Sequence, residues 1–198
     1  SIQYLQKAIN NNQPNVKELS GSVANTLVEQ IDHLSKIAAD FSQFANIGNT
    51  NIQLFDLHEV IRSLIDLYQP NELVEIKWLP VNNSVIVNQD KTQMNRLFTN
   101  LFMNAVQACQ ENESCRIEVR EKVDGDKLSI TIKDNGEGIP EDIQERIFIP
   151  NFTTKSSGTG LGLAMCQSIV EQAKGRIWFE TSKGNGSTFF VELPIVVD

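Results

Sequence analysis

The sequence predicts an α+β fold, a two-layer sandwich in which helices cover a mixed, mainly antiparallel sheet. From about residue 52 onward, short segments of alternating apolar and polar residues, typical of half-buried strands, occur between helical segments. Two adjacent strand segments are joined by Asp124-Gly125-Asp126, a hairpin signal that makes them antiparallel neighbours. A doubly wound parallel sheet fits this order less well.

The beginning of the chain differs in texture, and we expect two domains, residues 1–50 and residues 51–198. Residues 1–48 contain no convincing strand. Ser1–Ile9 predicts a short helix, and the polar segment Asn10–Pro14 predicts a break after it. The sequence shows no internal repeat.

A long helix is expected next, opened by Asn15 with Glu18 at capping-box spacing and stopped near Gly48. Its apolar residues recur at spacings of four and three and therefore share one face. They are Leu19, Val23, Leu27, Ile31, Leu34, Ala38, Phe41 and Ala45. One short helix cannot cover this narrow seam, so we expect the long helix to pack in a bundle or a dimer.

The second domain is expected to alternate helices and strands. Asp56 can cap a helix that Pro70 closes, and a loop rich in Gly, Pro and Thr covers Asp134–Thr159. The expected elements are helix Asp56–Pro70, strands Val74–Leu79 and Ser84–Asn88, helix Asp90–Gln110, strands Cys115–Val123 and Lys127–Lys133, a helix ending at Ala173, and strands Arg176–Glu180 and Thr188–Leu193.

Composition limits the classes of function. The net charge is −8, from 17 Lys+Arg against 25 Asp+Glu, and no Lys/Arg-rich run is present, so nonspecific nucleic-acid binding is not expected. No apolar stretch approaches the roughly 20 residues that cross a bilayer, and the amino terminus does not resemble a signal peptide. Three cysteines (Cys109, Cys115 and Cys166) without CxxC spacing argue against a disulfide framework and a zinc site. We therefore expect a soluble, acidic protein of the reducing cytoplasm.

Asn100 and Asn104 lie four residues apart on an expected helix, so their side-chain amides project from one face. That face borders the apolar one, so the pair would be partly buried and would need partners. An amide oxygen is a hard ligand suited to Mg²⁺, which binds through few protein groups plus phosphates. Taken alone, the pair also fits two ordinary helix-surface asparagines.

Two glycine-rich segments follow. Asp134–Pro140 (Asp-Asn-Gly-Glu-Gly-Ile-Pro) comes directly after a strand, where a carboxylate can accept a hydrogen bond from an exocyclic amine such as that of adenine. Gly158–Leu163 (Gly-Thr-Gly-Leu-Gly-Leu) opens a helix, where exposed backbone N–H groups and the helix dipole favour polyphosphate. Its spacing is neither a dinucleotide fingerprint nor a Walker loop. Each segment by itself also fits an ordinary turn or flexible loop.

In combination the motifs are specific. The asparagine pair, Asp-x-Gly-x-Gly, Gly-x-Gly-x-Gly and a late Gly186-Ser187-Thr188 occur in this order, with Phe148–Lys155 (Phe-Ile-Pro-Asn-Phe-Thr-Thr-Lys) among them. Over about residues 54–194 this set resembles the ATP-binding domain shared by sensor histidine kinases, gyrase, Hsp90 and MutL. The histidine kinase branch is the most similar, and Phe-x-Pro-x-Phe-Thr-Thr-Lys resembles the nitrogen-regulation (NtrY/NtrB-like) sensors. The resemblance, rather than periodicity, implies the histidine kinase/gyrase/Hsp90-type fold.

The resemblance implies ATP and Mg²⁺ as ligands. Asn104 matches the Mg²⁺-coordinating asparagine and is the candidate metal ligand, Asn100 matches its polar partner near the phosphates, and Asp134 matches the adenine-binding aspartate. Asn100 and Lys155, which can reach a phosphate, are the candidate catalytic side chains. The candidate ATP-binding residues are Asn100, Asn104, Gln107, Ala108, Asp134, Gly136, Gly138, Ile139, Phe152, Thr154, Lys155, Gly158, Thr159, Gly160, Leu161, Gly162, Leu163 and Thr188.

Further roles follow from the same resemblance. Ile139 is expected to form a wall of the base pocket, and Thr188 to assist Asp134 through water. Phe148 and Phe152 match anchors of a lid over Thr153–Thr159 that nucleotide orders. Family members often carry a basic or aromatic residue just after the asparagine motif, whereas Gln107 and Ala108 stand there in this chain, so one phosphate contact is not matched.

The resemblance implies a transferase of two-component signal transduction. A protein-histidine kinase passes the γ-phosphoryl group of ATP to a histidine, and a phosphorelay continues to an aspartate of a response regulator receiver domain. In the gyrase-like ATPases the position of Asn100 holds a water-activating glutamate; an amide has no such basicity, so transfer is favoured over hydrolysis. The alternatives are a nucleotide-binding regulatory module without phosphotransfer and a gyrase- or Hsp90-like ATPase.

Neither histidine fits the phosphoacceptor, and both are expected to be solvated helix residues. His33 lies midway along the long helix, and His58 is followed by Glu59 but by no Asn-Pro or Thr-Pro. By its position Ser1–Ile9 resembles the end of the first bundle helix, so residues 1–50 are expected to be a partial dimerisation region that lacks the acceptor and cannot autophosphorylate. A homodimer is expected for the full-length parent and stays open for the fragment, and an inner-membrane anchor of the parent is an analogy with NtrY-like sensors.

Overall fold

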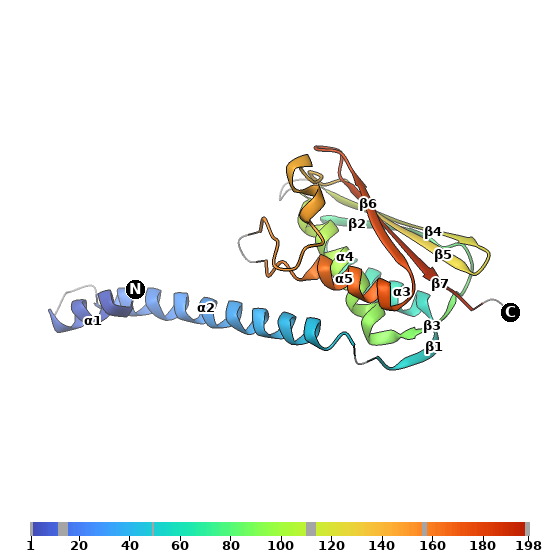
Figure 1. Ribbon diagram of the computed structural model, residues 1–198. Helices are drawn as coiled ribbons and strands as arrows, with labels where there is room; N and C mark the ends of the chain where they lie inside the picture. Colours follow the sequence, from blue (N-terminus) through green and yellow to red (C-terminus); the bar gives the residue numbers. More distant parts are fainter. Residues whose placement is uncertain (1, 12–15, 49, 110–113, 156–157, 197–198) are drawn as a thin grey trace. The chain divides into compact units, whose positions relative to one another are not determined.

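The structure is a computed structural model that describes residues 2–11, 16–48, 50–109, 114–155 and 158–196 (Figure 1). The chain divides into two compact units, Ser1–Gln43 and Phe44–Asp198. No helix in the described ranges is long and apolar enough to span a membrane.

The first unit is helical, as the sequence predicted. It contains α1 (Ile2–Asn10) and most of α2 (Val16–Ala45), which ends three residues before Gly48. The expected capping residue Asn15 lies outside the described residues. Most apolar side chains of the expected seam are exposed in the single chain, with Ile31, Leu34 and Phe41 60 to 64% exposed, whereas Val23 is buried. The bundle or dimer that would cover them stays a prediction.

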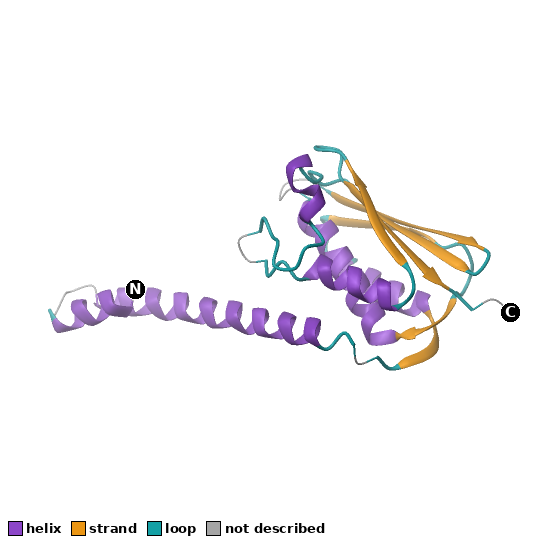
Figure 2. Cartoon of the chain, viewed as in Figure 1, coloured by secondary structure: helices purple, strands orange, loops and turns teal. Residues whose placement is uncertain are grey.

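The second unit is a two-layer sandwich (Figure 2). Its sheet has the order β2-β4-β5-β7-β6, in which β2 and β4 are parallel and every other pair is antiparallel. Helices α3, α4 and α5 pack on one face of it. The elements are β1 (Ile52–Asp56), α3 (Leu57–Tyr68), β2 (Val74–Leu79), β3 (Ile86–Asp90), α4 (Lys91–Ala108), β4 (Cys115–Asp124), β5 (Lys127–Asp134), the 3₁₀ helix η1 (Glu141–Arg146), α5 (Gly162–Gln172), β6 (Arg176–Thr181) and β7 (Ser187–Pro194). The predicted α+β fold with a mixed, mainly antiparallel sheet is confirmed.

Strand β1 was not predicted from the sequence. It pairs antiparallel with β3 in a separate two-stranded sheet, where Phe55 lies opposite Val87 and both are buried. Ile52 and Leu54 are 59 and 65% exposed. The segment therefore carries apolar residues on both faces and lacks the alternation by which a half-buried strand is recognised.

Two aspartates begin the helices that support the rest of the unit. The Asp56 carboxylate accepts a hydrogen bond from the backbone N–H of His58 at 3.0 Å, and that of Asp90 accepts one from Gln93 at 3.0 Å. Each bond satisfies one of the N–H groups that a helix leaves unpaired in its first turn. Helix α4 then packs against α3, α5 and the sheet, with one side buried in the core.

The core lies between the helices and the sheet. Its fully buried larger side chains are Leu57 and Ile61 of α3, Met94, Leu97, Phe98, Leu101 and Phe102 of α4, Ile117 of β4, Leu128, Ile130 and Ile132 of β5, and Ile169 of α5. These residues occupy every second strand position and every third or fourth helix position, as a two-layer packing requires.

The expectation that His58 is a solvated residue was wrong. Its side chain is fully buried, with Nε2 2.9 Å from Oε2 of Glu121 and Nδ1 3.4 Å from the carbonyl oxygen of Asn83. Glu121 also accepts from the indole N–H of Trp78 at 2.9 Å. A polar residue in the first turn of α3 is thus inside because β4 and the loop before β3 supply its partners. The side chain of His33 lies outside the described ones.

The expectation about the cysteines also needs correction. Cys109 and Cys115 form a disulfide, with their Cα atoms 5.4 Å apart, because the end of α4 and the start of β4 lie side by side. Cys166 is a free, buried cysteine of α5, and burial raises the pKa of its thiol.

Candidate functional site

Three segments of the second unit meet at the candidate site: the exposed side of α4, the loop after β5 and the loop before α5. Their meeting points follow the direction of α4. At its carboxyl end the Ala108 carbonyl oxygen accepts a hydrogen bond from the N–H of Glu137 at 3.1 Å. Two turns earlier, a Cβ on Gly162 would lie 2.8 Å from Oδ1 of Asn100, so the first turn of α5 touches that amide. The predicted base and phosphate motifs therefore lie at different points along one helix.

Asp134 ends β5 and is 3% exposed. Its Oδ1 accepts hydrogen bonds from the backbone N–H groups of Gly136 at 2.9 Å and Ser187 at 3.1 Å. Burial raises the pKa of this carboxyl, and the two backbone bonds oppose the rise. The described residues place no donor on Oδ2, which is left to accept a hydrogen bond from a ligand.

Two glycines allow the backbone to close around Asp134. A Cβ on Gly136 would lie 2.4 Å from the carbonyl oxygen of Ala108. Gly186 has a φ of +78°, and a Cβ on it would lie 2.0 Å from the carbonyl oxygen of Asp134. Both contacts are closer than any side chain permits, so only glycine fits these positions.

The β6–β7 turn contributes residues that the sequence analysis missed. The Thr181 hydroxyl accepts from the N–H of Ile139 at 2.9 Å, donates to the carbonyl oxygen of Gly186 at 3.1 Å, and lies 3.0 Å from the hydroxyl of Ser187. These bonds attach the predicted base-pocket wall Ile139 to the turn. The sequence does show hydroxyl residues at the ends of both strands. Only the pairing register of β6 with β7 shows that Thr181 and Ser187 lie opposite each other.

Thr188, the expected helper of Asp134, lies elsewhere. In the sheet it pairs with Lys133 and Glu180, and its side chain therefore projects from the opposite face of β7 to that of its neighbour Ser187. Ser187 is 5% exposed and its backbone binds Asp134. The residue that the structure brings to Asp134 is thus Ser187, one residue earlier, and its hydroxyl lies 3.0 Å from that of Thr181.

The phosphate side of the site is formed by Asn100 and the start of α5. The Asn100 amide donates to the carbonyl oxygen of Arg96 at 2.9 Å, which leaves Oδ1 facing Gly162. Leu161 precedes α5, and among the described residues no side chain caps the first turn of that helix. Its backbone N–H groups are therefore available to an anion.

Lys155 lies on the amide oxygens of α4. Its ammonium is 3.2 Å from Oδ1 of Asn104 and 2.6 Å from Oε1 of Gln107. The oxygen of Asn104, the expected metal ligand, is thus presented to a cation. Gln107 stands where family members often carry a basic or aromatic residue. Its side-chain oxygen accepts a hydrogen bond from Lys155, whose positive charge is suited to a phosphate.

The remaining predicted residues lie around this centre. The guanidinium carbon of Arg146 lies 4.3 Å from the ring centroid of Phe152. The ring centroids of Phe148 and Phe179 are 6.0 Å apart. Thr154 is exposed, the described glycines Gly138, Gly158 and Gly160, with Thr159 and Leu163, are half-buried, and Leu161 is buried. Ser156 and Ser157 of the expected lid lie outside the described residues. The structure thus gathers the predicted site residues into one region, with Thr188 as the exception.

The chain matches the family described as "Histidine kinase-, DNA gyrase B-, and HSP90-like ATPase" over residues 89–197. Sensor histidine kinase ZraS of Salmonella typhimurium is 30% identical over 180 residues, which are 89% of this chain and 38% of that protein. The chain therefore spans less than half the length of this curated relative. The narrower likeness to NtrY/NtrB-like sensors is only approximate, since the relative is a ZraS kinase.

Solved structures agree with this match. The catalytic domain of histidine kinase ThkA superimposes with a TM-score of 0.66 at 32% identity and covers 73% of this chain and 96% of that domain. ThkA in complex with the response regulator TrrA has a TM-score of 0.72 at 22% identity, over 98% of this chain and 61% of that one, and shares the fold. With its buried aspartate, paired asparagines and glycine-rich helix start, the chain belongs to the histidine kinase-, DNA gyrase B- and HSP90-like ATPase family and carries an ATP-binding catalytic domain of the histidine kinase type.

Proposed function

We propose that this chain is the catalytic part of a two-component sensor histidine kinase, which transfers the γ-phosphoryl group of ATP to a histidine on a helical bundle. Residues 51–198 are the catalytic domain in this proposal, and residues 1–50 are part of the dimerisation bundle. The phosphorylated histidine then passes the group to an aspartate of a response regulator.

The observation that carries the proposal is the identity of the side chain beside the phosphate loop. Asn100 Oδ1 faces Gly162 at the start of α5. An amide there can orient a group by hydrogen bonds but cannot take a proton from water, so the residue at this position cannot serve as the general base of an ATPase. This favours phosphoryl transfer to another nucleophile. Catalysis of that transfer depends on positioning the nucleophile and on stabilising the charge of the phosphoryl group.

The nucleotide is oriented by the order of contacts along α4. Its base enters beside Ala108 and Gly136, where Oδ2 of Asp134 accepts a hydrogen bond from the exocyclic amine of adenine. Its phosphates lie on the N–H groups of the α5 start, next to Asn100. The raised pKa of Asp134 is consistent with a carboxylate placed for recognition rather than for stability.

The residues present fit a magnesium ion bound with the nucleotide. Asn104 already presents its oxygen to the Lys155 ammonium, as it would to a metal cation. Among the described residues no group of three or more His, Cys, Asp or Glu side chains is placed to hold a metal by itself. A site of one amide oxygen completed by phosphates and water suits Mg²⁺, which would neutralise charge on the triphosphate. Asn104 would hold it, and Lys155 would move to a phosphate.

Label transfer tests the proposal. The chain is mixed with γ-labelled ATP, Mg²⁺ and a separately produced helical bundle that carries a phosphoacceptor histidine, and label is measured on the bundle and as free phosphate. We expect label on the histidine and little free phosphate. Asn104→Ala should abolish Mg-dependent transfer, whereas Asn88→Ala, on an exposed position of β3, should leave it unchanged.

The same experiment separates the alternatives. A regulatory module that binds nucleotide without phosphotransfer gives neither label nor free phosphate. A gyrase- or Hsp90-like ATPase gives steady phosphate release from the chain alone. Either result would overturn the kinase proposal.

The partners of the proposed kinase are ATP, a response regulator receiver domain and a second copy of the parent chain. The complex of ThkA with TrrA supports the response regulator. The exposed apolar seam of α2 supports a bundle with another chain. A cytoplasmic place for this part, with a membrane anchor elsewhere in a longer parent, agrees with the kinase proposal.

A further inference from the structure

Helix α4 shows from which side a phosphoacceptor must approach. The base site lies at Ala108, Asn104 lies one turn closer to the amino end, and Asn100 and the phosphate loop lie one further turn along. Each step of four residues advances about 6 Å. In the nucleotide orientation proposed above, the triphosphate points toward the amino end of α4, and the turn that follows Asn100 in that direction is that of Arg96.

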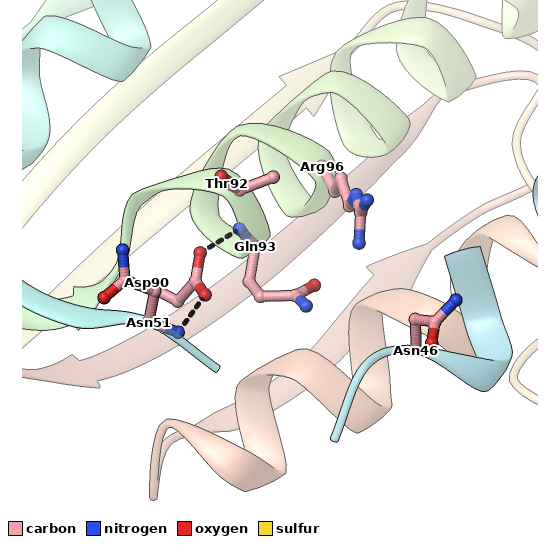
Figure 3. A pocket seen from close by; sticks show the side chains of 6 residues that line it. All are labelled: Asn46, Asn51, Asp90, Thr92, Gln93 and Arg96. Atoms are coloured by element: carbon pink, nitrogen blue, oxygen red, sulfur yellow. Dashed lines mark hydrogen bonds between the residues drawn. The ribbon is translucent and has the colours of Figure 1, made fainter. Parts of the chain in front are cut away.

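A cavity of about 360 Å³ lies at that turn (Figure 3). The side chains of Arg96 and Gln93 extend from α4 toward the segment that carries Asn46. Its lining residues are Asn46, Asn51, Asp90, Thr92, Gln93 and Arg96. All six lie within the second unit.

Of the two charged side chains in this cavity, Asp90 has hydrogen-bond partners and Arg96 has none among the described residues. The carboxylate of Asp90 accepts the backbone N–H of Asn51 at 2.6 Å and that of Gln93 at 3.0 Å, so both its oxygens are engaged. Arg96 is half-buried, and the described residues offer its guanidinium no ion pair and no hydrogen bond. A half-buried guanidinium without a partner is suited to bind a carboxylate from another molecule, which it can hold through two parallel hydrogen bonds.

A second, independent observation concerns Gln93. Its side chain is 4% exposed, and its Nε2 donates a long hydrogen bond of 3.5 Å to the carbonyl oxygen of Ile47. Its Oε1 is buried and has no hydrogen-bond partner in the described part of the chain. Buried oxygens are almost always paired, so this one marks a place where a donor from outside is missing.

We propose that this cavity is the docking subsite for the phosphoacceptor, which binds a carboxylate side chain of the acceptor helix on Arg96 and a hydrogen-bond donor of the same helix on Gln93. The inference rests on the proposed kinase function. In an in-line transfer the acceptor nitrogen attacks phosphorus opposite the leaving oxygen. Its lone pair forms the P–N bond as the bond to the β–γ bridging oxygen breaks, and ADP leaves with that electron pair toward Asn104 and Ala108. The acceptor therefore stands on the side of Arg96.

The occupant is an unphosphorylated protein helix rather than a free anion. The acceptor reaches the site before it carries phosphate, so the anionic group available to Arg96 is a carboxylate. The cavity also offers the Thr92 hydroxyl on the same face of α4, one turn from Arg96. A helix that presents one acid and one donor matches that row of groups better than a single small ion does.

The test measures acceptor and nucleotide separately. Arg96→Gln and Arg96→Glu are compared with the unchanged chain for transfer to the histidine-bearing bundle, and ATP and ADP affinities are measured by calorimetry. We expect Arg96→Gln to raise the KM for the bundle about ten-fold, the effect of losing one charge-assisted pair, with both nucleotide affinities unchanged. Changing the paired acid of the bundle to Lys should restore transfer by Arg96→Glu. Arg120→Gln, an arginine paired with Glu118 on the sheet, is the matched control and should behave as the unchanged chain.

Two results would overturn the subsite. An unaltered KM for the bundle with Arg96→Gln would show that Arg96 does not contact the acceptor. Weaker binding of ATP with unchanged binding of ADP would place Arg96 on the γ-phosphate instead.

A binding measurement separates failure of the subsite from failure of the kinase function. The chain loaded with a non-hydrolysable ATP analogue is titrated with the bundle, with no transfer required. Binding that Arg96→Gln weakens supports the subsite even if no label is transferred; absent or equal binding removes it. Gln93→Met, which removes the unpaired oxygen, should weaken bundle binding without lowering the melting temperature, and unchanged binding would exclude Gln93 from the subsite.

Discussion

Asp134 is an acidic residue whose side chain is buried in the second unit. Burial raises its pKa, and the N–H groups of Gly136 and Ser187 reduce the rise. The folded chain therefore binds the carboxyl proton more tightly than the unfolded chain does. Ionised Asp134 lowers the free energy of unfolding at neutral pH, and this loss disappears as the pH falls through the raised pKa toward the unfolded value of about 4.

The first prediction separates recognition from stability at this residue. Asp134→Asn keeps the shape and can still accept both backbone bonds, but it presents an amide to the adenine amine. We expect ADP binding to weaken by about 1–3 kcal/mol, while the melting temperature stays equal or rises because a buried charge is removed. Calorimetry and thermal unfolding measure the two effects. Unchanged ADP affinity would show that the carboxylate does not read the base.

A second prediction concerns the hydroxyl beside Asp134. Ser187→Ala removes a hydroxyl that lies 3.0 Å from that of Thr181 in the base pocket, whereas Thr188→Ala alters the opposite face of β7. We expect Ser187→Ala to weaken ADP binding by about 1 kcal/mol, the typical effect of one hydrogen bond, and Thr188→Ala to leave it unchanged. If Thr188→Ala is the more damaging, the register argument for Ser187 fails.

At the scale of elements, the β6–β7 turn holds the loop after β5 in place. The N–H of Gly184 donates to the carbonyl oxygen of Glu137 at 2.7 Å, and Gly186 lies against the backbone of Asp134. A turn between two neighbouring strands thus fixes the loop after a third. Its shape depends on two glycines with positive φ, +79° at Gly184 and +78° at Gly186.

The third prediction uses these glycines as a matched pair. Alanine at either position has the same unfavourable φ, which costs about 1 kcal/mol. A Cβ at Gly184 would meet nothing within 4 Å, but one at Gly186 would lie 2.0 Å from the Asp134 carbonyl oxygen. Gly184→Ala should therefore cost only the conformational strain, and Gly186→Ala should cost more and also weaken nucleotide binding. Thermal unfolding and ADP titration of both variants check this; equal effects would mean that the turn moves freely to accept the methyl group.

At the scale of the whole molecule, the buried apolar residues are unevenly divided. The second unit has a continuous core built from α3, α4, α5 and the sheet. In the first unit, Val23 is the buried apolar side chain among those the structure describes there. Because apolar burial supplies most of the stability of a domain, the second unit should be stable without the first.

The fourth prediction follows from this division. A chain that begins at Phe44 should unfold at the same temperature as the 198-residue chain and bind ADP with the same affinity, within about two-fold. Circular dichroism and calorimetry measure both. A large loss of stability would show that the helices of the first unit support the catalytic unit, and the proposed boundary near residue 50 would then be wrong.

The elements with a regular apolar period were predictable from the sequence. Strand β2 has its predicted bounds, Val74–Leu79, and α4 runs from Lys91 to Ala108 within the predicted Asp90–Gln110. The motif residues of the site were also found, because glycines, amides and a strand-end aspartate keep a fixed order along the chain. β1 was missed, because the pairing that defines it comes from β3, which lies thirty or more residues away.

The sequence by itself determined which chemical groups this protein carries and in what order: an aspartate after a strand, two amides one turn apart, and a glycine-rich helix start. Only the tertiary structure decided which of these groups face one another. It placed Ser187 rather than Thr188 beside Asp134, buried His58 on Glu121, and brought Arg96 together with Asn46 and Asn51 around one cavity. The reason is physical: local patterns follow from the periods of helix and strand, whereas a strand's register and a helix's direction against a sheet come from packing between distant segments.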